Sequence, residues 1–167
     1  MTDRILLRIT TMQITNNFSV ASSPSTVWAA LVDIGRVAPC FPGARLTASD
    51  GDVHSGEVKV KLGPVAVTFV GQLALKQRDD ANLRCVLTAE ASDRKQRGNL
   101  HADIEFVVSA SADGADVQTT TELQLTGPVA QYGRAAGLIE KMAARNIEQF
   151  ATQLAATLRE DAAEGLA

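Results

Sequence analysis

Hydrophobic and polar residues alternate with a period of two through the middle of the chain, between Ala44 and Leu125. Val58 and Val60, for example, are each followed by a lysine. This alternation predicts antiparallel strands, each with one apolar and one polar face. Turn-forming residues divide the run into about six strands, at Ser49 to Asp52, Gly63-Pro64, Arg78 to Asn82, Asp93 to Asn99 and Ala112 to Gly114. With a β-prone segment before them at Gln13 to Val20, about seven strands are expected.

Before and after this run, the hydrophobic residues recur at helical spacing instead. After the first strand, Pro24 and the serines around it form a helix start, and Val27, Trp28 and Leu31 then recur at helical spacing. Two short helices are expected there. Near the C-terminus, residues Pro128 to Glu160 predict one helix, which would span roughly 45 Å. Its apolar stripe consists of Ile139, Ala143, Ile147, Phe150, Leu154 and Leu158.

The first half of this predicted helix has unusually small side chains. It contains Ala130, Gly133, Ala135, Ala136 and Gly137. A glycine inside a helix costs about 1 kcal/mol relative to alanine. The taper therefore predicts either another backbone packed closely there or a cavity beneath the thin end of the helix.

The composition is that of one ordinary globular domain. The chain has 167 residues, 46% hydrophobic content and a formal charge of -3, which argues against disorder and against nucleic acid as a partner. The expected organisation is a flexible lead or upstream start at 1–11, one domain at 12–160 and a short polar tail at 161–167. No run approaches the roughly 18 apolar residues of a spanning helix, so a soluble chain is expected. Cys40 and Cys85 lie far apart without a CxxC spacing, which favours a reduced, cytoplasmic setting, with peripheral contact at the inner face of the membrane as an option.

Three landmarks along the chain carry a family resemblance. They are Trp28 in the first helix, the Phe41-Pro42-Gly43 turn and the Gly63-Pro64 hairpin, and the Gly127-Pro128 helix entry supports them. Their order resembles the CoxG-like family of carbon monoxide dehydrogenase subunits, from about Met12 to Arg159.

The resemblance implies membership of the START-like, or polyketide cyclase and lipid-transport (SRPBCC), superfamily. The expected fold is an α+β helix-grip fold, in which a strongly curved antiparallel sheet of about seven strands wraps around a long C-terminal helix, with two short helices after the first strand. Such folds enclose an apolar cavity. The family also implies a non-enzymatic accessory role beside a molybdenum hydroxylase of the carbon monoxide dehydrogenase type, in membrane attachment or electron transfer.

The candidate ligand-binding residues are those that could frame such a cavity. They are Phe41, Phe69, Tyr132, Gly133, Ala136 and Ile139. The hydroxyl of Tyr132 could donate a hydrogen bond to a ligand carbonyl while its ring packs. A lipid or a quinone is the expected ligand, and a closed, filled core is the alternative at each position. No cofactor is expected.

The charged candidates are a basic cluster and a metal-like stripe. Arg94, Lys95 and Arg97 could contact anionic headgroups or an acidic partner, or could form an ordinary solvated loop. His101 and its neighbours Asp103 and Glu105 alternate along one strand, at a spacing that metal ligands can have. Because Leu100, Ala102, Ile104 and Phe106 already define the apolar face of that strand, the stripe is expected to face water rather than a metal.

No catalytic centre is predicted. Cys40 is expected to be a packed thiol, since neither histidine stands in a recognisable nucleophile motif. The favoured function is an accessory protein that binds a lipid or quinone. The alternatives are a ligand-free assembly or recruitment subunit and an enzyme of the polyketide cyclase type.

Overall fold

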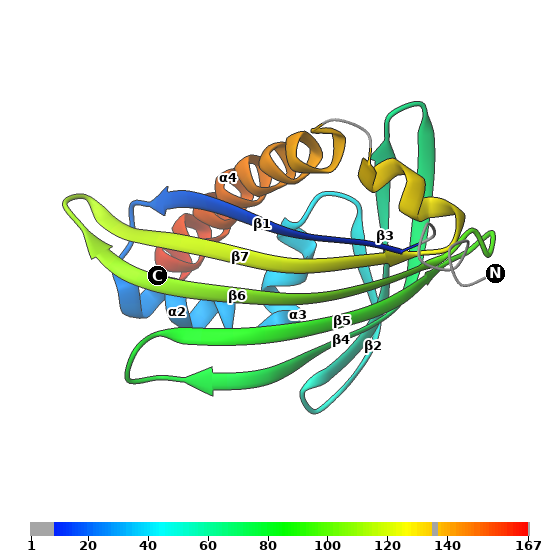
Figure 1. Ribbon diagram of the computed structural model, residues 1–167. Helices are drawn as coiled ribbons and strands as arrows, with labels where there is room; N and C mark the ends of the chain where they lie inside the picture. The colour runs from blue at the N-terminus through cyan, green and yellow to red at the C-terminus, as the bar shows by residue number, and fades with distance from the viewer. Residues whose placement is uncertain (1–8, 135–136, 167) are drawn as a thin grey trace.

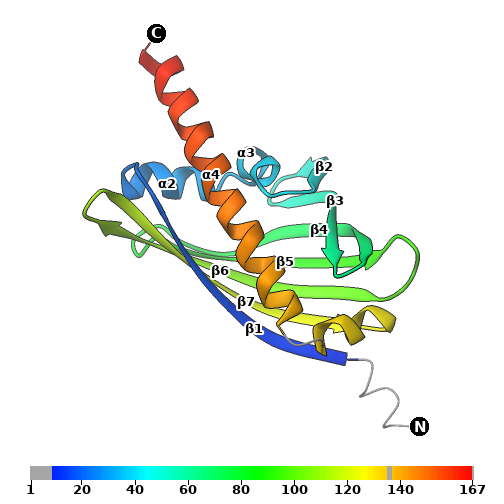
Figure 2. The same cartoon turned by 90° about the horizontal axis from the view of Figure 1, so that it is seen from above.

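The computed structural model describes residues 9–134 and 137–166. A seven-stranded antiparallel sheet, with strand order β1-β7-β6-β5-β4-β3-β2, curves around the long helix α4 (Figure 1). The short helices α2 and α3 lie on the same side of the sheet as α4 (Figure 2). This arrangement confirms the predicted helix-grip fold.

The elements are, in chain order, β1 (Ile9–Val20), α2 (Pro24–Leu31), α3 (Ile34–Val37), the 3-10 helix η1 (Ala38–Cys40), β2 (Ala44–Asp50), β3 (Val53–Leu62), β4 (Val65–Asp79), β5 (Arg84–Asp93), β6 (Asn99–Ser111), β7 (Gly114–Thr126), the 3-10 helix η2 (Pro128–Arg134) and α4 (Leu138–Leu166).

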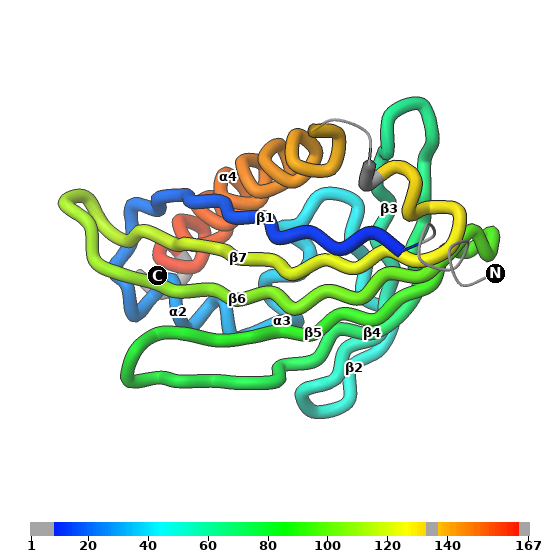
Figure 3. Tube along the Cα trace, in the orientation of Figure 1, coloured from blue at the N-terminus to red at the C-terminus, as the bar shows by residue number. Residues whose placement is uncertain are grey.

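The first strand of the chain pairs with the last. β1 and β7 run side by side along their whole length, from Ile9 opposite Thr126 to Val20 opposite Ala115 (Figure 3). The strand begins three residues before Met12, so residues 9–11 of the expected lead belong to the sheet. Residues 1–8 lie outside the described part of the chain.

The sheet bends sharply where two glycines face each other. Gly56 in β3 pairs with Gly71 in β4. A Cβ atom on Gly56 would lie 2.4 Å from the carbonyl oxygen of Arg45, and one on Gly71 would lie 2.0 Å from that of Glu90. Irregular pairing at Leu46/Ala48 and at Leu75/Gln77 adds to the bend, as β-bulges do. Backbones come too close at this row for any larger residue.

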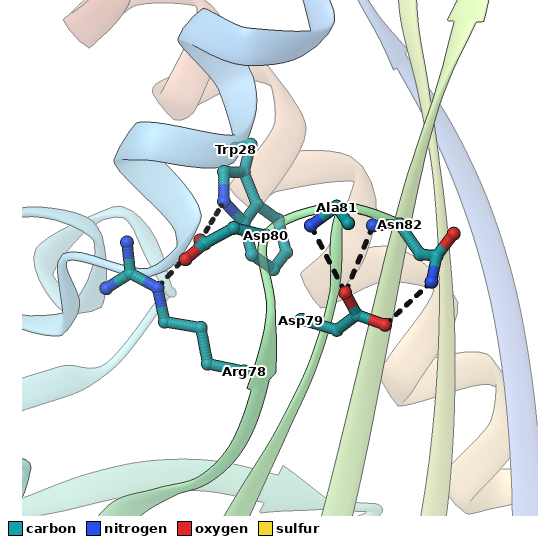
Figure 4. Close-up of polar contacts among 6 residues, drawn as sticks. All are labelled: Trp28, Arg78, Asp79, Asp80, Ala81 and Asn82. Atoms are coloured by element: carbon teal, nitrogen blue, oxygen red, sulfur yellow. Dashed lines mark hydrogen bonds and ion pairs between the residues drawn. The ribbon is translucent and has the colours of Figure 1, made fainter.

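Helix α2 is tied to a distant hairpin. Its N-cap Ser23 accepts a hydrogen bond from the backbone N–H of Thr26, as the sequence predicts. Trp28 is buried, and its indole N–H donates to the Asp80 carboxylate at 2.9 Å, to which Arg78 also donates (Figure 4). The tryptophan therefore fixes the first helix against the turn between β4 and β5.

The prediction of one continuous C-terminal helix is wrong for its first part. Residues 128–134 form the separate 3-10 helix η2, and α4 begins only at Leu138. Gly137 has a φ of 70°, a left-handed conformation that an α-helix cannot contain and that glycine adopts readily. The glycine therefore lies at a break between two helices, where it carries no helix-interior cost. Ala135 and Ala136 fall outside the described residues.

The second part of that prediction is confirmed. Ile139, Phe150, Leu154 and Leu158 of the apolar stripe are buried, and the ring of Phe150 meets Phe18 of β1 edge to face, with centroids 5.8 Å apart. The helix continues to Leu166, so most of the expected polar tail is helical. None of the helices in the described ranges has the length and apolar composition needed to cross a bilayer.

The close approach at Gly71 predicts a large effect from a single methyl group. Gly71→Ala should lower the free energy of unfolding by about 3 kcal/mol, because the added Cβ would overlap the backbone of β5. Urea unfolding followed by circular dichroism measures this. The control is Gly35→Ala in the exposed part of α3, where a Cβ has room and stability should change little or rise. Equal effects at the two glycines would contradict the proposed bend.

Candidate functional site

The buried core consists of two clusters rather than one. The first lies around α2 and the middle and end of α4, with Trp28, Phe18 and Phe150 among its members. The second lies near η2 and the start of α4, with Phe69 and Ile139 among its members. Between them, the concave face of the sheet carries apolar side chains that are not fully covered.

These apolar side chains on the concave face are called here the concave patch. The strand register places all of them on the same face as buried Phe69 or Leu87, yet each is only half-buried. The concave patch consists of Val58, Val60, Leu73, Leu75, Ala89, Ala91, Leu100 and Ile104. Ile104 packs against both core clusters, which places the patch between them. Apolar residues at the centre of a filled core would be buried, so solvent reaches this face.

The helix leaves this surface open because of where it rests. The backbone of α4 comes closest to β1 at one edge of the sheet and to β3 toward the other. It crosses the concave side between them (Figure 2). The side chains of central strands β4, β5 and β6 therefore keep access to solvent beneath it.

The predicted ligand-binding residues fall into two places. Phe69 and Ile139 are buried in the second cluster, and half-buried Tyr132 of η2 packs against this cluster. Phe41 is half-buried against the first cluster. Gly133 lies in η2, and Ala136 is outside the described residues. The structure brings three of the predicted residues together at one end, and two of those, Phe69 and Ile139, are buried.

Sequence reasoning missed the residues of the concave patch. Their alternation marks them as inward-facing, but alternation does not reveal how completely an inward side chain is covered. A hollow of about 530 Å³ lies on the opposite, outer face, lined by Val70, Gln72, Glu90, His101 and their neighbours. That hollow is open and partly polar, so it is not the predicted apolar site.

The basic cluster is largely neutralised within the chain. Arg94 pairs with Glu57 of β3. Arg97 donates from Nε to the Asp93 carboxylate at 2.6 Å and from its backbone N–H at 3.0 Å, and its guanidinium also reaches the Ala66 carbonyl. Hydrogen bonding from Arg97 holds the pKa of Asp93 below its ordinary value, and the same hydrogen bonding raises the pKa of the Arg97 guanidinium. The pair closes the turn between β5 and β6.

The metal-like stripe lies on the outer face, as expected. His101 Nδ1 is 3.3 Å from Glu90, and its Nε2 is 3.6 Å from Asp103, which also accepts a hydrogen bond from Thr88. Glu105 pairs with Arg84. Within residues 9–134 and 137–166, no group of three histidine, cysteine or acidic residues is arranged to hold a metal ion.

Both cysteines are free and buried. Cys40 Sγ lies 3.7 Å from the hydroxyl of Thr157, which cannot act as a base toward it. Burial raises the pKa of the Cys85 thiol to about 11, so this thiol stays protonated and unreactive at neutral pH.

The chain matches the family model described as the carbon monoxide dehydrogenase subunit CoxG over residues 17–159. It belongs to this family. No curated protein matches it. Solved structures similar to this CoxG-family chain include a conserved protein from Geobacillus kaustophilus, with 13% identity, 89% of this chain and 96% of that chain covered, and a TM-score of 0.73.

Two named enzymes are similar in fold. The Zhui aromatase/cyclase from Streptomyces sp. R1128 has 13% identity, with 90% of this chain and 94% of that chain covered and a TM-score of 0.57. Norcoclaurine synthase from Thalictrum flavum has 13% identity, with 94% of this chain and 91% of that chain covered and a TM-score of 0.60. At this identity the likeness shows the START-like fold alone.

The Asp93 and Arg97 pair predicts a pH dependence of stability. Because the folded pKa of Asp93 is lowered, its contribution is complete above the unfolded value of about 4 and is lost as the pH falls through the folded pKa. Asp93→Asn should lower the free energy of unfolding by about 2 kcal/mol at pH 7. The difference from the wild type should shrink as the pH falls from about 5 toward 2.

Urea unfolding at a series of pH values measures this difference. Asp113→Asn, at an exposed turn between β6 and β7, is the matched control and should differ little from the wild type throughout. A difference at Asp93 that persists unchanged in acid would show that the carboxylate's charge is not what stabilises the turn.

Proposed function

We propose that this chain is a non-catalytic accessory protein of a molybdenum hydroxylase of the carbon monoxide dehydrogenase type, which holds an apolar small molecule on the concave patch beneath α4. The observation that carries this proposal is the half-burial of apolar side chains at the centre of the fold. Covering apolar surface with an apolar ligand contributes about 25 cal/mol for each Å² removed from water. Membership of the CoxG family supports the link to the enzyme.

The ligand is a lipid or an isoprenoid quinone. Such molecules match the concave patch, whose members are all aliphatic. A membrane-dissolved electron carrier must leave the bilayer to meet an enzyme outside it, and a protein surface of this kind can shield its tail from water. The proposal thus joins ligand binding to electron transfer or membrane recruitment of the enzyme.

The turn between β5 and β6 is the proposed contact with the enzyme or the membrane surface. Arg94 and Arg97 have partners in this chain, and among the described residues no ion pair involves Lys95, which is exposed. One cation contributes only about 1 kcal/mol at an anionic surface. Any docking through this turn is therefore weak and sensitive to salt.

The enzyme alternative has less support from the concave face. The strand carboxylate that points inward is Asp93, which is fully engaged by Arg97. His54 shares the face by register, but its Nδ1 lies 2.8 Å from the Ser49 hydroxyl near the end of the β2–β3 hairpin. The third reading, a recruitment subunit with no ligand, differs from the proposal in predicting that no molecule binds the concave patch.

A blocking substitution tests ligand binding. Ala89→Phe places a ring over the centre of the concave patch and should weaken ligand binding at least 10-fold, because the ring occupies the apolar space. Binding is measured by the fluorescence of pyrene, a hydrocarbon, and by its displacement with a decyl-tailed benzoquinone. Ala74→Phe is the control, since Ala74 is also half-buried but faces outward on the neighbouring strand.

The wild type and Ala74→Phe should bind both probes equally well, with circular dichroism showing that all three proteins are folded. Failure of the wild type to bind either probe would favour the recruitment subunit. Equal binding by Ala89→Phe and Ala74→Phe would place the ligand elsewhere.

A further inference from the structure

Polar side chains interrupt the apolar interior between the two core clusters. In the middle of β1 the inward positions are Ile14, Asn16 and Phe18, and Asn16 is the polar one of these three. Thr10 also faces inward at the start of the strand, but its hydroxyl already donates to the Ala130 carbonyl oxygen at 2.7 Å. On α4, half-buried Asn146 lies in the core-facing stripe between Ala143 and Phe150. On β7, inward-facing Thr121 is also half-buried. These three, Asn16, Thr121 and Asn146, are called here the polar layer.

The members of the polar layer come from elements that lie side by side. Strand β1 and helix α4 run in the same direction: Ile14 and Ile139 share the second cluster, while Phe18 and Phe150 are in contact in the first. Asn16 therefore lies beside the turn of α4 that follows Ile139 and precedes Phe150, which is where Asn146 is placed. On the other side, Ile14 pairs directly with Thr121. The layer thus separates the two clusters and borders the concave patch through Ile104, which also pairs with Thr121.

The hydrogen-bonding capacity of the polar layer is unused within the described chain. The nearby Thr119 hydroxyl is engaged, since it donates to the Asn16 carbonyl oxygen at 3.4 Å. No side-chain hydrogen bond between described residues involves the amide of Asn16, the amide of Asn146 or the hydroxyl of Thr121, and none of their polar atoms is sealed from solvent. An asparagine amide offers two donors and one acceptor. Leucine would fill the same space without the cost of desolvating an amide.

We infer that the polar layer binds the head of the ligand, and that this head is uncharged and carries carbonyl or hydroxyl oxygens. This inference rests on the proposed function, and it adds the chemistry that selects the ligand. Amide and hydroxyl groups satisfy a carbonyl or hydroxyl oxygen by hydrogen bonds but do not neutralise a charge. The layer contains no cation to pair with a carboxylate or phosphate. A neutral quinone-like head is therefore favoured over a fatty acid or an anionic phospholipid, with the tail on the concave patch.

Near-isosteric substitutions separate head recognition from burial of the tail. Asn16→Leu and Asn146→Leu should each weaken binding of decyl-benzoquinone about 10-fold, as expected for the loss of one or two hydrogen bonds to a neutral head. Binding of pyrene, which has no polar atom, should stay within twofold of the wild type. The controls are Asn17→Leu, which faces outward on the same strand, and Gln149→Leu on the exposed side of α4; both should bind both probes normally. Decanoate should compete poorly in every case.

The outcomes distinguish this inference from the proposed function. If the wild type binds neither probe, the proposed function fails and the inference fails with it. Suppose the wild type binds both probes. If the two asparagine variants then retain full quinone affinity, or if decanoate binds as tightly as the quinone, the proposed function stands and only the assignment of the ligand head to the polar layer is wrong. Should a leucine variant fail to fold, Thr121→Val removes a single hydroxyl with little change of shape. It should weaken quinone binding several-fold without affecting pyrene, and an unchanged quinone affinity would overturn the inference.

Discussion

The sharp bend of the sheet at Gly56 and Gly71 is the constraint on which the rest of the structure depends. Backbone atoms of neighbouring strands come so close at this row that a single methyl group would overlap them. The bend turns a flat sheet into a concave one, and a concave sheet of seven strands is wider than one helix can cover. Apolar side chains on the central strands are left half-buried as a result. The proposed ligand site is thus a consequence of curvature.

The position of α4 follows from the same geometry. The helix packs along β1, where Phe150 meets Phe18, and its far end is held to α3 by the ion pair between Arg36 and Asp161. Its start is set by the left-handed conformation of Gly137. The turn that closes β5 and β6 is fixed separately by Asp93 and Arg97. The two ends of the interior are therefore packed firmly, while its middle contains the concave patch and the polar layer.

Much of the fold could be predicted from the sequence because its signals are local. The alternation at Val58 and Val60, the helix start at Ser23 and Pro24, and the apolar stripe of α4 all predict the elements that form. The order of Trp28, the Phe41 turn and the later glycine-proline pairs predicted the family, which the match over residues 17–159 shows. Family membership in turn predicted the curved sheet.

What could not be predicted depends on contacts between distant residues. A glycine inside a helix and a glycine that ends one have the same neighbours in sequence, so the break at Gly137 was missed. The partner of Arg94 is Glu57, in a different strand, and the basic cluster was therefore expected to be freer than it is. The extent of burial on the concave face depends on how far α4 stands from the central strands, which no pattern in one segment encodes. For the same reason, the sequence could not show how completely Phe69 and Ile139 are buried in the second cluster.

We propose that the concave patch holds an apolar molecule in the cell. Native mass spectrometry of the protein purified from its own cells, followed by organic extraction of the retained molecule, tests it most directly. We expect one bound neutral lipid or quinone per chain, which is released on unfolding. A protein that emerges empty, and stays empty after incubation with membrane extract, would contradict ligand binding on the concave patch.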